Sequence, residues 1–118
     1  MYVQGAVLGV KANREQDYIE LANFMGQIML DHGAIEVVEN WEEDLPEGDF
    51  LQLRDVIDVE PDEKVVFSWV AWPSKEFHAS IEQDLMQDER MTQLPADLPF
   101  EEKRMAVGGF RSIYSSRG

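Results

Sequence analysis

The sequence predicts an α+β domain in which a ferredoxin-like antiparallel sheet carries two helices on one face. Two stretches of helical period each follow an apolar run of strand type, and each begins with a helix start signal. The strongest strand signal in the chain, residues 64–72, lies between these two helices. The resulting order of strand, helix, strand, extended segment, strand, helix and strand is ferredoxin-like. A chain of 118 residues has room for one such domain, which we expect to span residues 1–118.

The first strand is expected at residues 2–10 and the first helix at residues 14–32. Asn13 and Gln16 have the spacing of a capping box, in which two side chains satisfy backbone N–H groups at a helix N-terminus. Apolar residues then recur at three- and four-residue spacing, as on the buried face of a helix. Gly33 follows the last turn and tolerates the positive φ that commonly ends a helix.

The middle of the chain is expected to supply two strands and a less regular extended segment. Residues 34–41 alternate in a way that places Glu39 and Trp41 on the same face. Residues 51–59 alternate imperfectly, which we interpret as a further extended segment. Residues 64–72 form a strand that is apolar on both faces.

The second half repeats the strand, helix and strand pattern. Ser74 is of a type preferred at helix N-caps, and the helix that follows it ends near Gln87 or Asp88. An irregular stretch that contains two prolines leads to a final strand at residues 105–114.

The strands at residues 2–10 and 64–72 are largely apolar on both faces, although two helices can cover only one face of the sheet. A monomer would therefore expose a large apolar patch. We expect a second copy of the chain to pack sheet against sheet, which gives a homodimer with a barrel-like centre.

The composition argues against several classes of function. The chain has 24 acidic and 10 basic residues, a net charge of −14, which makes nucleic acid and anionic membranes poor partners. It has no cysteine, which excludes disulfides, thiolate metal sites and cysteine nucleophiles. Neither metal-ligand spacings nor phosphate-binding loop motifs occur, so we expect no metal and no cofactor. The apolar N-terminus lacks a basic region, and we expect a cytoplasmic protein that does not bind membranes.

Five side chains are candidates for a ligand site between the sheet and the helices: His32, Glu39, Trp41, His78 and Arg104. Each histidine lies on an apolar helix stripe and could handle protons there, but more commonly His32 would serve the helix C-terminus and His78 would be half-exposed. Trp41 would line a cavity or, more commonly, pack in the core. Arg104 would either clamp an anionic ligand or form a structural ion pair. The ion pair is the favoured role, and Glu39 is its expected partner.

Short motifs that extend over nearly the whole chain carry a family resemblance. They are Val38-Glu39-Asn40-Trp41, Asp44-Leu45-Pro46-Glu47-Gly48, Val65-Val66-Phe67-Ser68-Trp69, Trp72-Pro73-Ser74-Lys75, Asp88-Glu89-Arg90-Met91, Leu98-Pro99-Phe100, and Lys103-Arg104-Met105 with Gly108-Gly109-Phe110. In their order and spacing they resemble the YbaA-like family of small uncharacterised bacterial proteins, which is placed in the dimeric α/β-barrel superfamily.

The resemblance implies a dimeric α/β barrel. Barrels of this kind often bind a small hydrophobic or aromatic molecule between each sheet and its two helices, and some are cofactorless monooxygenases or isomerases. Two classes of function stay open: a small-molecule-binding protein, with or without such an enzymatic activity, and a non-catalytic dimer that acts in stress response or in protein interactions. An open cavity of several hundred Å³ lined by a Trp and a polar group would favour the first class, and a packed interior the second.

Overall fold

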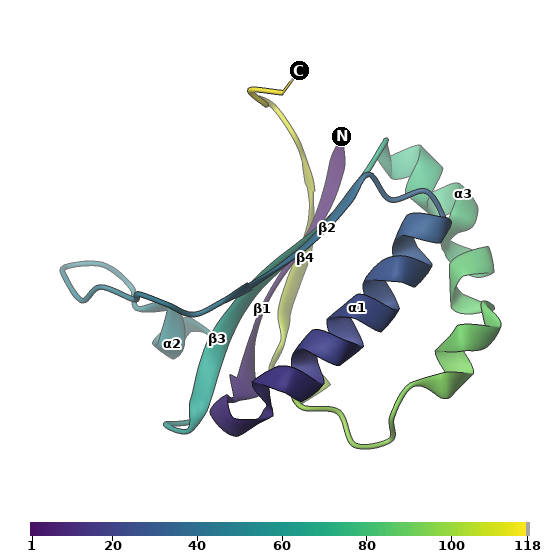
Figure 1. The fold of residues 1–118 in the computed structure, drawn as a ribbon. Coiled ribbons are helices and arrows are strands. Elements are labelled where there is room, and N and C mark those ends of the chain that lie inside the picture. Colours follow the sequence, from purple (N-terminus) through teal and green to yellow (C-terminus); the bar gives the residue numbers. More distant parts are fainter. Residues whose placement is uncertain (118) are drawn as a thin grey trace.

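A four-stranded antiparallel sheet is the centre of the computed structural model, which describes residues 1–117 (Figure 1). The strands and α-helices are β1 (Tyr2–Lys11), α1 (Glu15–Asp31), β2 (Glu36–Trp41), α2 (Leu53–Val56), β3 (Glu63–Trp72), α3 (Lys75–Met86) and β4 (Ala106–Arg111). Short 3-10 helices lie at η1 (Ala12–Arg14), η2 (Glu89–Gln93) and η3 (Glu102–Arg104). The strand order is β2-β3-β1-β4, and the two long helices α1 and α3 pack on the same face of the sheet (Figure 1). The order of the strands and long helices is the predicted ferredoxin-like one.

The structure confirms the four sheet strands and the two long helices near the predicted positions, although β4 is shorter than the predicted strand. The two central strands pair from Tyr2 opposite Trp72 to Lys11 opposite Glu63. Ser74 caps α3 as expected, because its Oγ accepts a hydrogen bond from the backbone N–H of Phe77 at 3.0 Å. At the end of α1, Gly33 adopts a φ of 104°, a conformation that L side chains rarely adopt.

The predicted extended segment at residues 51–59 is wrong, since these residues contain the short helix α2. The Arg54 side chain fixes this turn by donating to Glu42 Oε1 at 2.9 Å and to the Glu60 carbonyl at 3.0 Å. The apolar side chains that suggested a strand are partly at the surface, and Leu51 and Leu53 are exposed. The loop that carries α2 extends from the end of the sheet, away from α1 and α3 (Figure 1).

The predicted capping box at the start of α1 is also wrong. Asn13 lies within the 3-10 helix η1, and Arg14 occupies the N-cap position without a side-chain capping bond. Arg14 instead donates to Asp17 at 3.0 Å, and Glu15 and Asp17 place negative charge in the first turn. These carboxylates interact favourably with the positive end of the helix dipole.

The core lies between the sheet and the long helices in two clusters. One cluster is formed by the buried residues Leu8, Val10, Tyr18 and Val66. The other is formed by Ile28, Ala34, Trp72 and Leu85. The fully buried Trp72 indole donates its N–H to Gln4 Oε1 at 2.9 Å, which satisfies its polar atom inside the core.

Neither α1 nor α3 covers the opposite face of the sheet, which we call the open sheet face. A shallow groove of about 610 Å³ runs across it, with apolar side chains from three strands: Val3, Val7, Phe67, Trp69 and Phe110. Phe67 and Phe110 are 50% and 60% exposed. Exposed aromatic side chains on one surface are typical of an interaction face.

Candidate functional site

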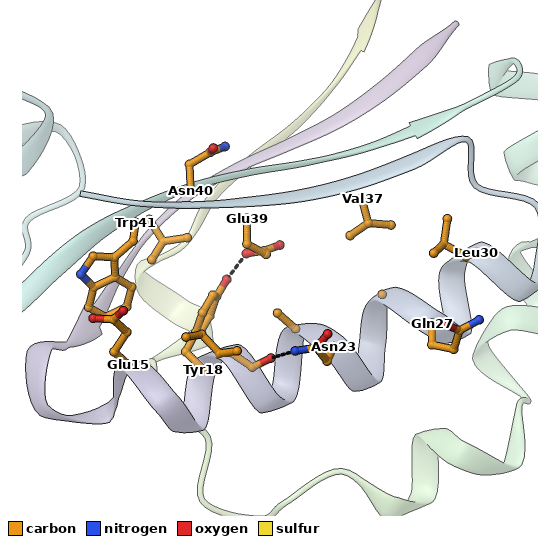
Figure 2. Close-up of a pocket in the computed structure, with 13 residues that line it drawn as sticks. Glu15, Tyr18, Asn23, Gln27, Leu30, Val37, Glu39, Asn40 and Trp41 are labelled. Carbon is orange, nitrogen blue, oxygen red and sulfur yellow. Dashed lines mark hydrogen bonds between the residues drawn. The ribbon is translucent and has the colours of Figure 1, made fainter. Parts of the chain in front are cut away.

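Two cavities flank α1 on the side that faces the sheet. The first, of about 460 Å³, lies between α1 and β2 (Figure 2). The second, of about 520 Å³, lies between α1, the central strands and the chain that leads into β4. Both cavities are lined by Tyr18, Ala22 and Glu39, so these residues lie where the two spaces adjoin. We call the combined space the α1 cleft.

Glu39 and Tyr18 form the polar centre of the α1 cleft. The alternation of β2 directs Glu39, Val37 and Trp41 toward α1, while Asn40 points the other way (Figure 2). Tyr18 lies on the inner side of α1 and donates its hydroxyl hydrogen to Glu39 Oε1. Its ring packs edge-on against Phe100, with the ring centroids 6.1 Å apart. This packing holds the hydroxyl in position beside the carboxylate.

The environment of Glu39 changes its acidity. Partial burial of the carboxyl group raises the pKa of Glu39, and the neighbouring hydroxyl groups of Tyr18 and Ser68 lower it by a smaller amount, so the net change is upward. Burial, together with the neighbouring Glu39 carboxylate, raises the pKa of Tyr18 far above its usual value. Tyr18 therefore keeps its proton and acts as a hydrogen-bond donor.

The second cavity is mainly apolar. Its walls come from α1, β1, β3 and the segment before β4, and they include Leu21, Met25, Met29, Val70, Phe100 and Met105. Methionine side chains are flexible and polarisable, so they adapt to ligands of different shape. The cleft therefore combines an adaptable apolar wall with one carboxylate and one phenol hydroxyl. Its volume lies in the range typical of small-molecule sites, about 300–1,000 Å³.

Of the five predicted site residues, Glu39 and Trp41 line the α1 cleft, whereas His32, His78 and Arg104 line neither of its cavities. His32 follows the last turn of α1, with Nε2 2.9 Å from Asp88 Oδ2. His78 packs against aromatic rings, with its centroid 5.0 Å from that of Trp72. The predicted convergence of both histidines and Arg104 on the cleft is therefore wrong.

Arg104 forms an ion pair, but its partner is Glu63 and not the expected Glu39. Its guanidinium donates to Glu63 Oε1 at 2.8 Å and to Oε2 at 2.7 Å. The pair lowers the pKa of Glu63, a residue only 2% exposed, to about 2. Arg104 lies in the 3-10 helix before β4, which places it beside the start of β3. Gly9 adjoins the pair, and a Cβ there would lie 3.0 Å from Glu63 Oε1.

Tyr18 is the central site residue that sequence reasoning missed. Helical spacing puts it on the apolar stripe of the first helix, and the structure does place it in the core. A buried tyrosine hydroxyl requires a hydrogen-bond partner, and that requirement was the signal for a polar group opposite it. Ser68 is a second polar neighbour, since it lies opposite Glu39 in the β2–β3 register.

Residues 1–117 contain neither a metal-binding cluster nor a membrane-spanning helix. No group of three or more His, Cys, Asp or Glu side chains in this range is arranged to hold a metal ion. Nor does any helix in the range have the length and apolar character to cross a bilayer.

Comparisons with known proteins match almost the whole chain. A family described as "Protein of unknown function (DUF1428)" matches residues 1–102. The uncharacterised protein YbaA of Escherichia coli strain K12 is 39% identical over 112 residues, which cover 95% of this chain and 96% of that protein. YbaA of Shigella flexneri matches with the same identity and coverage. A crystal structure of an uncharacterised NIPSNAP domain protein from Burkholderia xenovorans is similar with a TM-score of 0.55 and 12% identity, covering 95% of this chain and 94% of that one. At this identity the similarity shows a shared fold.

Proposed function

The chain belongs to the DUF1428 family of proteins of unknown function, and we propose that it is a homodimer that binds a small, largely apolar molecule in the α1 cleft. The observation that carries the proposal is the exposure of Glu39. This residue lies on the helix-covered face of the sheet, yet it is exposed and lines both cavities of the cleft. A face of a sheet that is packed tightly against a helix does not leave a carboxylate accessible. The α1 cleft is therefore open space with a polar anchor.

The first experiment tests whether the α1 cleft takes up an apolar molecule. Native mass spectrometry of the freshly purified protein would look for a retained small molecule, and Nile red, an uncharged apolar dye, would serve as a fluorescent probe. We expect the wild-type protein to bind the dye and Met25→Trp to lose binding, because the larger side chain fills the second cavity.

The matched control is Met86→Trp, since Met86 lies at the end of α3 and is 71% exposed. This variant carries the same substitution outside the cleft and is expected to bind the dye like the wild type. Undiminished dye binding by Met25→Trp would contradict the proposed location. It would leave the non-catalytic, protein-interaction dimer as the better description.

The open sheet face supports the homodimer. It displays aromatic side chains from β3 and β4, namely Phe67, Trp69 and Phe110. At the margin of this face, the Glu36 carboxylate accepts hydrogen bonds from Trp69 Nε1 at 2.8 Å and from Arg117 Nη1 at 3.2 Å. A second copy packed on this face removes the apolar groups of both subunits from water, which is the main driving force for association. The α1 cleft lies on the other side of the sheet and stays accessible in such a dimer.

A further inference from the structure

The charged residues around the α1 cleft are of one sign. Glu15 and Glu39 are the ionisable acids that line its two cavities, and no lysine, arginine or histidine in the described part of the chain joins them. A ligand carboxylate or phosphate would therefore meet negative charge without a compensating cation. A ligand cation would meet favourable electrostatic interactions.

Glu39 differs in its partners from Glu63 and Glu42, two carboxylates that are more deeply buried. The guanidinium of Arg104 neutralises Glu63, and Arg54 lies 2.9 Å from Glu42. Glu39 accepts a hydrogen bond from the neutral hydroxyl of Tyr18 and lies opposite the neutral Ser68 in the β2–β3 register. Among residues 1–117, none of the ion pairs involves Glu39. Within residues 1–117, its negative charge is therefore met by a hydroxyl group and by no cationic side chain.

The Glu39 carboxylate can also accept a hydrogen bond from a further donor. A carboxylate offers about four lone-pair positions, and Tyr18 uses one of those on Oε1. The aromatic ring of Trp41 lies on the same side of β2 as Glu39 (Figure 2). Aromatic faces attract cations, so the surroundings of the carboxylate match an ammonium group better than a neutral hydroxyl.

We infer that the molecule bound in the α1 cleft is a protonated amine with an apolar body, with its ammonium group against Glu39. This inference rests on the proposed function, because it assigns a ligand class to that cleft. The apolar body lies in the second cavity, along the wall that contains Met25, Met29 and Phe100. The ammonium donates to the free positions of the carboxylate. The ligand thereby supplies the cation that the protein does not.

The test compares three ligands with the same phenyl group and different charges: 2-phenylethylamine, 2-phenylethanol and 3-phenylpropanoate. Isothermal titration calorimetry at physiological salt would measure each Kd. Only the amine adds a charge opposite to that of Glu39 to its hydrogen bond, so we expect it to bind about tenfold more tightly than the alcohol. The negatively charged 3-phenylpropanoate is expected to bind more weakly than the amine and the alcohol.

A pair of variants on β2 assigns the preference to Glu39. Glu39→Gln retains an oxygen that accepts the Tyr18 hydroxyl hydrogen but removes the negative charge, so the amine should bind no more tightly than the alcohol. Glu36→Gln removes the same charge from the opposite face of the same strand. It should retain the preference for the amine, which controls for general attraction to an acidic protein.

The outcomes separate this inference from the proposed function. Equal affinity for amine and alcohol, tighter binding of the carboxylate, or an amine preference that survives Glu39→Gln would each overturn the ligand class. Binding of Nile red without binding of the amine would also overturn it, while the cleft would remain a binding site. Failure of the dye and of all three ligands to bind would reject the cleft itself.

Discussion

The hydroxyl of Tyr18 on α1 donates a hydrogen bond to the carboxylate of Glu39 on β2. The two residues are 21 positions apart and meet at the junction of the two cavities of the α1 cleft. The bond therefore joins the helix to the sheet at the point where the packing between them is open. It also places the negative charge of Glu39 where a ligand can reach it.

Tyr18→Phe is expected to raise the pKa of Glu39 further. The hydrogen bond from Tyr18 favours the ionised carboxylate, so its removal leaves the upward effect of burial less opposed. We expect a loss of unfolding free energy of about 1 kcal/mol, as for a typical hydrogen bond. Carbon-detected NMR titration of the Glu39 carboxyl group would measure the pKa. The exposed Tyr114 provides the control Tyr114→Phe, and an unchanged Glu39 pKa in Tyr18→Phe would contradict the prediction.

Arg104→Ala is expected to destabilise the fold without affecting ligand binding. It leaves the buried Glu63 carboxylate without its cation, which typically costs about 3–5 kcal/mol. Chemical denaturation would measure the loss, and Lys103→Ala, a change at the exposed neighbouring residue, should be close to neutral. A wild-type unfolding free energy for Arg104→Ala together with lost ligand binding would instead support the original role of Arg104 as a ligand clamp.

The ion pair of Glu63 also predicts how stability depends on pH. The pKa of Glu63 is about 2 in the folded protein, below its value of about 4.3 in an unfolded chain. The carboxylate therefore contributes stability that is fully present above about pH 4.3 and is lost as the pH falls toward 2. Urea unfolding across this range should show the difference between wild type and Glu63→Gln becoming smaller at lower pH. A difference that stays constant would disprove the assignment to Glu63.

Phe110→Glu is expected to convert the proposed dimer into monomers. It places a charge on the open sheet face, where two copies would bury it without a partner. Sedimentation at micromolar concentration should give about twice the 13.6 kDa chain mass for the wild type and the chain mass for the variant. Phe50→Glu is the matched control, since Phe50 is similarly exposed but lies in the loop before α2. A wild-type monomer at this concentration would refute the dimer.

Nucleic acid is expected not to bind at physiological salt. The net charge of −14 opposes association with phosphates, and binding to nucleic acid depends strongly on basic side chains that replace counterions. Filter binding with RNA and DNA would test this. Tight retention of RNA or DNA that weakens as salt is added would contradict this prediction. It would show that a locally basic surface binds nucleic acid despite the net negative charge.

The sequence by itself determined the four sheet strands, the two long helices and which residues share a face of each element. Alternation places Glu39 and Trp41 on the helix side of β2, helical spacing identifies the inner side of α1, and Ser74 marks the start of α3. These features depend on residues that are near one another in the chain, and local periodicity describes them well. Where the local signal was weak, as in residues 51–59, the interpretation was wrong because side-chain contacts of Arg54 select a helical turn.

Only the tertiary structure decided which polar groups meet. Arg104 pairs with Glu63 across 41 positions and not with Glu39, because the 3-10 helix before β4 lies beside the start of β3. Periodicity says which way a side chain points, but not which distant segment lies opposite it. That choice depends on strand order, register and the packing of α1 over the sheet. Together these bring Tyr18 to Glu39 and leave a cleft open between α1 and the sheet.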